Sequence, residues 1–333
     1  MQSAAKNKSL APSSPNEESL ADVMHGLLLK QQEIASVIPQ DKPVFYVDIP
    51  VHLNIGDLLI NRGTDFFFLR YKYNVVARAS EYDYRITLKS MPKDATIVMH
   101  GGGNLGDIWP HHELVRQDVL KRFTNHKIIV MPQTVHFKDP ANLERFKGVY
   151  NRHPDLTLYL RDKVSQAFAH EHLTKHSYLM PDMAHQLWRD DPLLQIDKSG
   201  SGELFLGRTD CEADARRDTS LRTAMDWHHV TGPVARVEEI ALRTAMRLNP
   251  WAQLQPGMVS MWYKLRDTLI ARGAERLALY EYIFTDRLHA AILGLMLGKR
   301  VTVIDNNYGK LGNYFEAWMP GKIQLVRNAT DGI

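Results

Sequence analysis

The amino-acid sequence predicts an α/β fold in which two domains of similar architecture face each other across a cleft. The chain has 333 residues, which is longer than one hydrophobic core usually serves, so we expect two domains. Short apolar runs of strand length alternate with helix-like segments, as in parallel sheets covered by helices on both faces. Between two such series, residues 188–202 are rich in charge, proline, glycine and serine, which predicts a linker.

The predicted N-terminal domain covers residues 19–187 and follows a polar stretch. Residues 1–18 lack an apolar pattern and are expected to form a disordered tail. Residues 18–37 then show the spacing of an amphipathic helix. Strands are expected at residues 44–49, 74–77, 95–99, 127–131, 156–160 and 177–179, with a glycine loop at 100–107 and helices at 56–73, up to 123, at 140–152 and at 161–173.

The predicted C-terminal domain covers residues 203–333 and begins with a strand at residues 203–207. A less regular, helix-rich region follows up to about residue 272. Residues 282–305 are then predicted to form a strand, a turn, a helix and a second strand. A last helix at residues 311–319 is expected to cross back toward the first domain.

Composition limits the classes of function. The net charge of +3 gives no reason to expect nucleic acid as a partner. The single cysteine, Cys211, excludes an intrachain disulfide framework and fits a reducing compartment. We expect no metal, because the fifteen histidines are scattered and the pairs His111–His112 and His228–His229 are sequence neighbours that rarely meet on one ion. No apolar run approaches the length of a membrane span, so we expect a cytoplasmic protein.

The tetrad Asn-x-Gly-Asp occurs twice, as Asn54–Asp57 and as Asn104–Asp107. Each copy follows a predicted strand and precedes a predicted helix, the position where open α/β sheets bind ligands. The alternative is helix capping by the asparagine or aspartate side chain. Repetition at two strand–helix junctions favours a role beyond capping.

Residues 101–106 also match the G-x-G-x-x-G pattern of dinucleotide-binding proteins, but the surroundings argue against that role. The next predicted strand is followed by Pro132-Gln133-Thr134 in place of an acid that would bind a ribose. Asp107 at the helix entrance would also repel a pyrophosphate. A dehydrogenase is therefore the least favoured function.

The segment Thr285–His289 predicts an anion site. The helix that follows is apolar on all sides, so we expect it to be buried. Its N-terminus carries a partial positive charge, and Arg287 and His289 add to it, which is unfavourable unless an anion binds there. Arg161 and Arg208 follow predicted strands, and with Arg287 they would give three guanidinium groups for a ligand with a carboxylate and a phosphate. The alternatives are that Arg287 pairs with Asp286 or reaches solvent and that His289 is a core histidine.

Together these motifs resemble the polysaccharide pyruvyl transferase family, and most closely its bacterial exopolysaccharide enzymes. The matching pieces are His52-Leu-Asn-Ile-Gly-Asp57, Gly101-Gly-Gly-Asn-Leu-Gly-Asp107, Pro132-Gln-Thr-Val-His136, Arg161-Asp162, Asp182, Arg208 with Glu212, Asp226-Trp227 and Thr285-Asp-Arg-Leu-His289. The resemblance implies a GT-B-like fold of two Rossmann-like domains. It also implies transfer of pyruvate from phosphoenolpyruvate to two sugar hydroxyls as a cyclic ketal.

The resemblance also implies roles for particular residues. His289 and Arg287 would be catalytic, with His289 as the general acid. Phosphoenolpyruvate would be bound by Arg161, Arg208, Arg287, Leu288 and His289. The saccharide acceptor would be bound by Asn54, Asp57, Gly102, Gly103, Asn104, Asp107, Gln133 and His136. Phosphoenolpyruvate would be a co-substrate, and no metal or other cofactor is implied.

Three matters stay open at this level. The acceptor is expected to be lipid-linked, with the protein at the inner face of the membrane, and the helix at residues 18–37 is the surface expected to meet a partner or membrane. One rival function is a GT-B glycosyltransferase that uses a nucleotide-diphosphate sugar, since fold does not fix chemistry. Another is a non-catalytic sugar-binding relative, but the presence of Arg287 and His289 argues against a decayed active site.

Overall fold

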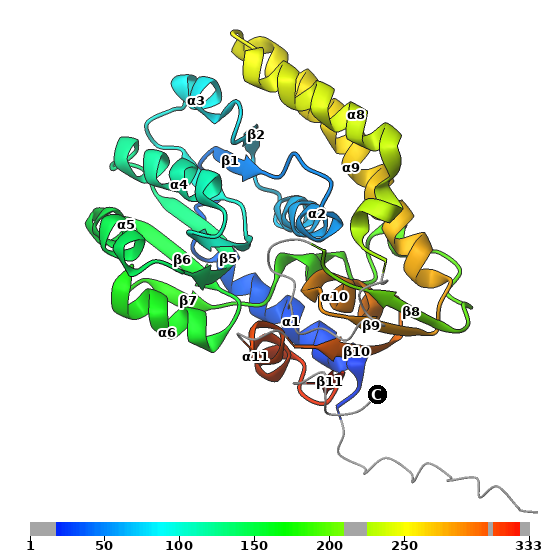
Figure 1. Cartoon of the computed structure of the whole chain (residues 1–333). Helices are drawn as coiled ribbons and strands as arrows, with labels where there is room; N and C mark the ends of the chain where they lie inside the picture. Colours follow the sequence, from blue (N-terminus) through cyan, green and yellow to red (C-terminus); the bar gives the residue numbers. More distant parts are fainter. Residues whose placement is uncertain (1–17, 210–224, 306–308, 327–333) are drawn as a thin grey trace, which may run out of the picture.

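Two parallel β-sheets with helices packed on them make up the protein (Figure 1). The structure is a computed structural model that describes residues 18–209, 225–305 and 309–326. The first sheet has the strand order β2-β1-β3-β5-β6-β7, with β4 paired to β5. Its strands are β1 (Val44–Ile49), β2 (Val75–Ser80), β3 (Thr96–Met99), β4 (Gly102–Gly106), β5 (Ile128–His136), β6 (Leu156–Leu160) and β7 (Ser177–Leu179). The second sheet, ordered β11-β10-β9-β8, consists of β8 (Glu203–Leu206), β9 (Tyr282–Thr285), β10 (Arg300–Ile304) and β11 (Gln324–Val326).

Helices connect successive strands, as parallel pairing requires. Those in the first half are α1 (Leu20–Ala35), α2 (Ile55–Arg70), α3 (Tyr84–Thr87), α4 (Pro110–Arg122), α5 (Pro140–Arg152) and α6 (Lys163–His172). Those in the second half are α8 (Trp227–Leu248), α9 (Gln255–Ala278), α10 (Leu288–Met296) and α11 (Lys310–Trp318). The mixed α/β class with parallel sheets is therefore confirmed. The division at residues 188–202 and the arrangement of two domains across a cleft stay predictions.

The hydrophobic core has two parts, one on each face of the first sheet. One face packs against α4, α5 and α6, through residues such as Val119, Tyr150 and Ala169. The other face packs against α2, and this cluster continues into the second sheet and α10. Every residue of β1 and β6 is buried, as expected for parallel strands covered on both sides. Helix α2 thus lies between the two sheets and contacts both α9 and α10.

The glycine loop predicted at residues 100–107 is largely a strand, and this prediction was wrong. Gly102–Gly106 forms β4, and β5 continues to His136 instead of ending at Met131. Strand β5 pairs with β3 up to Val130 and with β4 from Gln133 onward. Pro132, which has no N–H to donate, lies at the change of partner. A glycine-rich strand has no side-chain alternation, so its pairing is invisible in the sequence.

The stretch predicted as a linker is tied closely to α2. Arg62 forms two hydrogen bonds with the buried carboxylate of Asp191, at 2.6 and 2.7 Å. Within the same stretch, Pro192–Leu194 forms a short 3-10 helix, and Leu194 is buried. The charge and proline content that predicted a linker therefore belongs to a segment with fixed contacts.

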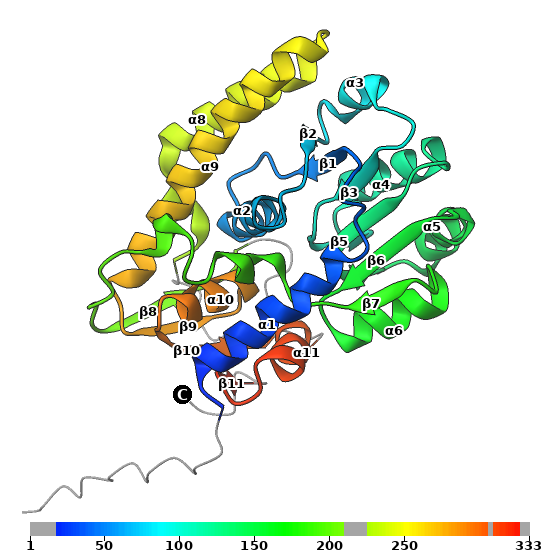
Figure 2. The same ribbon diagram turned by 180° about the vertical axis from the view of Figure 1, so that it is seen from behind.

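Helix α1 and the α8–α9 hairpin differ in how much of their surface the core covers. Helix α1 lies across both sheets and buries Val23, Met24, Leu27 and Ile34, so its apolar face is not available as the membrane surface expected from the sequence (Figure 2). Helices α8 and α9 pack along each other and extend together away from the sheets (Figure 1). No helix among the described residues combines the length and apolarity needed to cross a bilayer.

Candidate active site

A pocket of about 530 Å³ lies where strands of both sheets end. Its walls come from the segments after β1, β2, β6, β8 and β9, from β4 and the segment after it, from α8 at its start and at Arg243, and from α11. The lining includes His52, Asn54, Asp57, Gly103, Asn104, Trp109, His112, Arg161, Arg208, Asp226, Arg243, Arg287, Leu288 and His289. Ligands of open α/β sheets bind at the carboxyl ends of the strands, so the pocket occupies the expected position.

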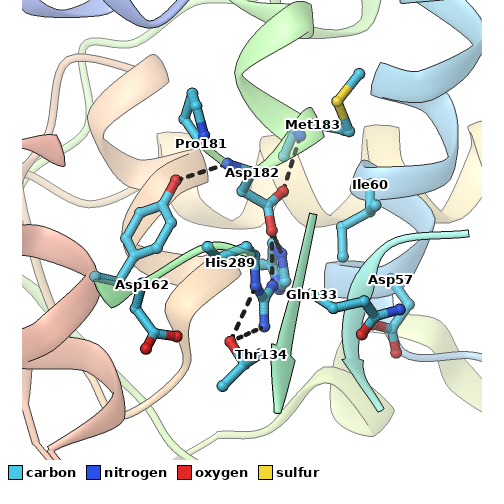
Figure 3. Close-up of polar contacts among 12 residues, drawn as sticks. Asp57, Ile60, Gln133, Thr134, Asp162, Pro181, Asp182, Met183 and His289 are labelled. Atoms are coloured by element: carbon cyan, nitrogen blue, oxygen red, sulfur yellow. Dashed lines mark hydrogen bonds and ion pairs between the residues drawn. The ribbon is translucent and has the colours of Figure 1, made fainter. Parts of the chain in front are cut away.

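One carboxylate, that of Asp182, holds two of the predicted site residues together. Its Oδ2 lies 2.7 Å from Nη1 of Arg161. The same oxygen lies 3.1 Å from Nε2 of His289 (Figure 3). Thr134 accepts two more hydrogen bonds from the Arg161 guanidinium. Burial alone would raise the pKa of Asp182, but His289 and Arg161 hold that pKa well below its ordinary value. Asp182 is therefore ionised, and it fixes the orientation of both the Arg161 and the His289 side chains.

The N-terminus of α10 opens into the pocket. Every residue of the helix except His289 is buried, as its apolar sequence predicted. Arg287 is its N-cap residue and makes no side-chain capping bond, so the first-turn N–H groups are not capped by that side chain. Nη2 of Arg287 lies 2.7 Å from Asp226, which comes from the start of α8. Burial would raise the pKa of Asp226, but the Arg287 guanidinium lowers it.

Arg208 and Leu288 also line this end of the pocket. The backbone N–H of Arg208 donates to Asp286 at 2.8 Å, which ties the end of β8 to the loop before α10. The structure therefore brings all five residues predicted to bind phosphoenolpyruvate into one pocket.

The first Asn-x-Gly-Asp tetrad lies against His289. Asn54 caps α2 by accepting from the N–H of Gly56, and its amide donates to Asp57 at 2.8 Å. A Cβ on Gly56 would lie 2.7 Å from Nδ1 of His289, so only glycine fits there. Burial would raise the pKa of Asp57, but His52 and the neighbouring histidines lower it. Capping and pocket lining thus occur together in the same tetrad.

The second tetrad is only partly in the pocket. Gly103 and Asn104 line it, whereas Gly102, Asp107, Gln133 and His136 are not among the lining residues. Gln133 is fully buried and accepts from the N–H of Asn104 while donating to its side-chain oxygen. Asp107 accepts from the backbone N–H groups of Lys138 and Asp139, near the start of α5. The acceptor-binding roles of these residues stay predictions.

A second histidine–aspartate pair in the pocket was not predicted. Nδ1 of His112 lies 2.8 Å from Oδ1 of the buried Asp48. Burial would lower the pKa of His112, but the Asp48 carboxylate raises it. Asp48 has φ of 66°, a left-handed conformation that is rare outside glycine and that re-aims its side chain at the end of β1. The signal available in the sequence was one charged residue inside an otherwise apolar strand.

Asp182 and Asp226 belong to the motifs shared with the family, but the sequence does not predict them as site residues. Asp182 follows β7 at the same edge of the sheet as Arg161, so its place after a strand was a usable signal. Their partners lie far away in sequence, which is why only the fold reveals the pairs.

Glu81, His111 and His112 form the one group among the described residues whose ligand atoms could hold a metal ion. Those atoms lie within 4.8 Å of one another. They also pair among themselves and with neighbours: Nε2 of His111 lies 3.8 Å from Glu81, and His112 is bonded to Asp48. The expectation that the protein needs no metal stays a prediction.

Comparison with known proteins identifies the family. The model of the family described as polysaccharide pyruvyl transferase matches residues 54–308. The chain belongs to the polysaccharide pyruvyl transferase family. It is 34% identical over 316 residues to a Bacillus subtilis protein named as a pyruvyl transferase, EpsO, covering 93% of this chain and 97% of that one. It is 29% identical to pyruvyl transferase 1 of Schizosaccharomyces pombe, over 84% of this chain and 70% of that protein.

A solved structure supports the fold. An uncharacterised Klebsiella pneumoniae protein superimposes with a TM-score of 0.62 over 91% of this chain and 99% of its own. Since the two sequences are 18% identical, this likeness concerns the fold alone.

Proposed function

We propose that this polysaccharide pyruvyl transferase uses phosphoenolpyruvate as donor and forms a cyclic ketal across two hydroxyls of a saccharide, in bacterial exopolysaccharide synthesis. The observation that carries the proposal is the pairing of Arg161 and His289 on the single carboxylate of Asp182, beside the N-terminus of α10. This arrangement joins an anion-binding group and a proton donor within one pocket.

The positively charged side chains of the pocket suit phosphoenolpyruvate, which carries a carboxylate and a phosphate. Arg161, Arg208 and Arg287 lie there with His289, and the first-turn N–H groups of α10 add a partial positive charge. A guanidinium has five N–H donors, and the contacts of Arg161 with Asp182 and Thr134 leave donors for a substrate anion. The carboxylates of the pocket only partly neutralise its arginines. The anionic groups of the substrate would balance the remaining positive charge.

In the proposed chemistry, His289 donates a proton to C3 of phosphoenolpyruvate, and C2 becomes electrophilic. With Nε2 held by Asp182, Nδ1 is the ring nitrogen assigned to this transfer. One saccharide hydroxyl attacks C2 and loses its proton. The C2–O bond to phosphate then breaks, inorganic phosphate leaves, and a second hydroxyl closes the ketal with loss of its proton.

The acceptor is proposed to lie in the same pocket, beside Asn54, Asp57, Gly103 and Asn104, where the first tetrad meets His289. Asp57 is ionised in the structure and can orient a hydroxyl or accept its proton. His112 is a second acceptor for a hydroxyl proton, because Asp48 fixes its ring in the way that a carboxylate orients the histidine of a catalytic triad.

The test is to incubate the purified protein with phosphoenolpyruvate and candidate lipid-linked or nucleotide-linked saccharides. We expect release of inorganic phosphate together with a gain in acceptor mass equal to pyruvic acid minus water. His289→Ala is expected to abolish ketal formation while the protein remains folded by circular dichroism. Retained turnover in that variant would remove His289 from the acid role. Release of a nucleoside diphosphate from a sugar nucleotide would favour the rival glycosyltransferase.

A further inference from the structure

The α8–α9 hairpin carries an unusual concentration of exposed apolar side chains. Among the described residues, fourteen large hydrophobic side chains are exposed, and seven of them lie between Val234 and Met261. We define the hairpin surface as Val234, Val237, Ile240, Leu248, Trp251 and Leu254, whose exposed fractions lie between 49% and 72%. Soluble proteins seldom gather apolar residues in this way without a partner for the patch.

The helical spacing shows that the hairpin surface is not part of the intramolecular core. Residues Ala235, Leu242 and Met246 of α8 are buried and form its inward face. Val237, Ile240 and Leu248 lie on the opposite side of the helix, since each residue advances by about 100°. Trp251 and Leu254 continue the apolar surface around the turn between α8 and α9. The hairpin is therefore apolar on its outside as well as on its inside.

Basic side chains outnumber acidic ones around this surface, although the exposed Glu238 lies between Val237 and Ile240. Residues 240–266 contain no aspartate or glutamate, whereas Arg243, Arg247 and Lys264 lie among them. Arg243 and Arg247 follow Arg236 along one flank of α8, beside the apolar face. Both also lie over the ring of Tyr82, at 5.1 and 5.2 Å from its centroid, so their long side chains run along the surface of the protein. Arg236 and Arg243 both pair with the buried Glu239, so the flank keeps a net positive charge that complements an anionic surface.

From these features we propose that the hairpin surface docks on an anionic lipid bilayer. An outward apolar helix face, a flanking row of arginines and an exposed tryptophan at the hairpin end are what an interfacial helix needs. A second copy of the chain fits less well, because helices paired face to face would cover α8 and leave Trp251 and Leu254 at the turn exposed.

Docking through the hairpin has a consequence for the pocket. Arg243 on α8 is both next to the hairpin surface and part of the pocket lining. The bilayer surface would therefore lie close to the pocket, within reach of a lipid-linked saccharide. The docking itself stands apart from the proposed function, and only this use of it rests on that function.

The test is co-sedimentation of the full-length protein with phosphatidylcholine vesicles, with or without phosphatidylglycerol. We expect binding to the anionic vesicles that weakens with salt. The combined variant Leu248→Ser, Trp251→Ser, Leu254→Ser is expected to bind at least about tenfold more weakly. The matched control, Leu29→Ser, Leu69→Ser, Val164→Ser, removes three equally exposed apolar side chains elsewhere and should bind like the wild type.

Failure of the wild type to bind anionic vesicles would overturn the proposal, and so would unchanged binding by the hairpin variant. Light scattering after size-exclusion chromatography gives a second readout. A wild-type dimer that the hairpin substitutions convert to a folded monomer, without vesicle binding, would show that this surface joins two copies. Phosphate release with a soluble saccharide acceptor should be the same in the wild type and the hairpin variant. If neither the wild type nor the hairpin variant released phosphate, that result would instead count against the proposed function.

Discussion

Gly56 and His289 lie in direct contact, although they are more than two hundred positions apart in the sequence. A Cβ on Gly56 would lie 2.7 Å from Nδ1 and 3.0 Å from Cβ of His289. The first turn of α2 therefore sets how far the imidazole can approach the N-terminal half of the pocket. This contact links the first Asn-x-Gly-Asp tetrad to the start of α10 by packing, before any substrate is present.

Gly56→Ala is accordingly expected to displace the His289 ring and to lower kcat for ketal formation by about 100-fold, the scale on which misplacement of a reacting group acts. The control is Gly26→Ala in α1, because a Cβ there meets nothing within 4 Å. That variant should keep full activity and gain up to about 1 kcal/mol in its free energy of unfolding. Steady-state kinetics and thermal denaturation of the two variants check this. Wild-type kcat in Gly56→Ala would show that the ring position tolerates the shift.

Asp182→Asn is expected to affect catalysis and stability together, because one carboxylate orients both Arg161 and His289. We expect kcat to fall by at least about 100-fold, since carboxylates that orient catalytic histidines contribute on this scale or more. The free energy of unfolding should fall by about 2 kcal/mol, as for loss of a hydrogen bond to a charged group.

The matched control is Asp190→Asn, whose carboxylate is 59% exposed and pairs with Arg70 at the surface. Its unfolding free energy should stay within about 0.5 kcal/mol of the wild type, and kcat should not change. If Asp182→Asn behaved like this control, the pairing would have no role in positioning His289.

The two aspartates of the repeated tetrad should give different phenotypes. Asp57 lines the pocket, so Asp57→Asn is expected to raise KM for the saccharide by about tenfold, the effect of losing about 1.4 kcal/mol of binding. Asp107 instead accepts from two backbone N–H groups before α5. Asp107→Asn should lower the free energy of unfolding by about 1 kcal/mol and leave KM unchanged. If both substitutions raised KM for the saccharide equally, both aspartates would bind the acceptor, as the sequence predicts.

The Asp48–His112 pair predicts a pH dependence of stability. The pKa of His112 is raised on folding, so its contribution is complete below about pH 6.5 and is lost as the pH rises through the raised value. The pKa of Asp48 is lowered despite burial, so its contribution is present above about pH 4 and is lost as the pH falls through the lowered value. The stability difference between the wild type and Asp48→Asn should therefore be larger at about pH 6 than at about pH 9.

Urea denaturation at the two pH values measures this difference. Asp155→Asn is a suitable control, because its carboxylate is 50% exposed and pairs with Lys127 at the surface. That substitution should change stability little at either pH. A gap between the wild type and Asp48→Asn that stays constant from pH 6 to pH 9 would show that the charge on His112 does not stabilise the fold.

The sequence by itself determined the parallel α/β class, the family and the burial of α10. These follow from local signals: alternation of strand and helix patterns, motif order along the chain, and a helix that is apolar on all sides. The same local logic placed Arg161, Arg208, Arg287 and His289 after strands, and strand ends meet at one edge of a sheet.

The tertiary structure alone decided which charges pair and which tetrad faces the pocket. The partners of His289, Arg287 and His112 are Asp182, Asp226 and Asp48, and each pair is more than sixty positions apart in the sequence. Asp48 is also held in a left-handed backbone conformation. The glycines of β4 pair through their backbone only, so the sequence shows no side-chain pattern for this strand. Asp107 follows β4 directly and lies outside the pocket lining. Hydropathy records which residues are buried, whereas the register between strands and the packing between sheets decide which buried charges meet.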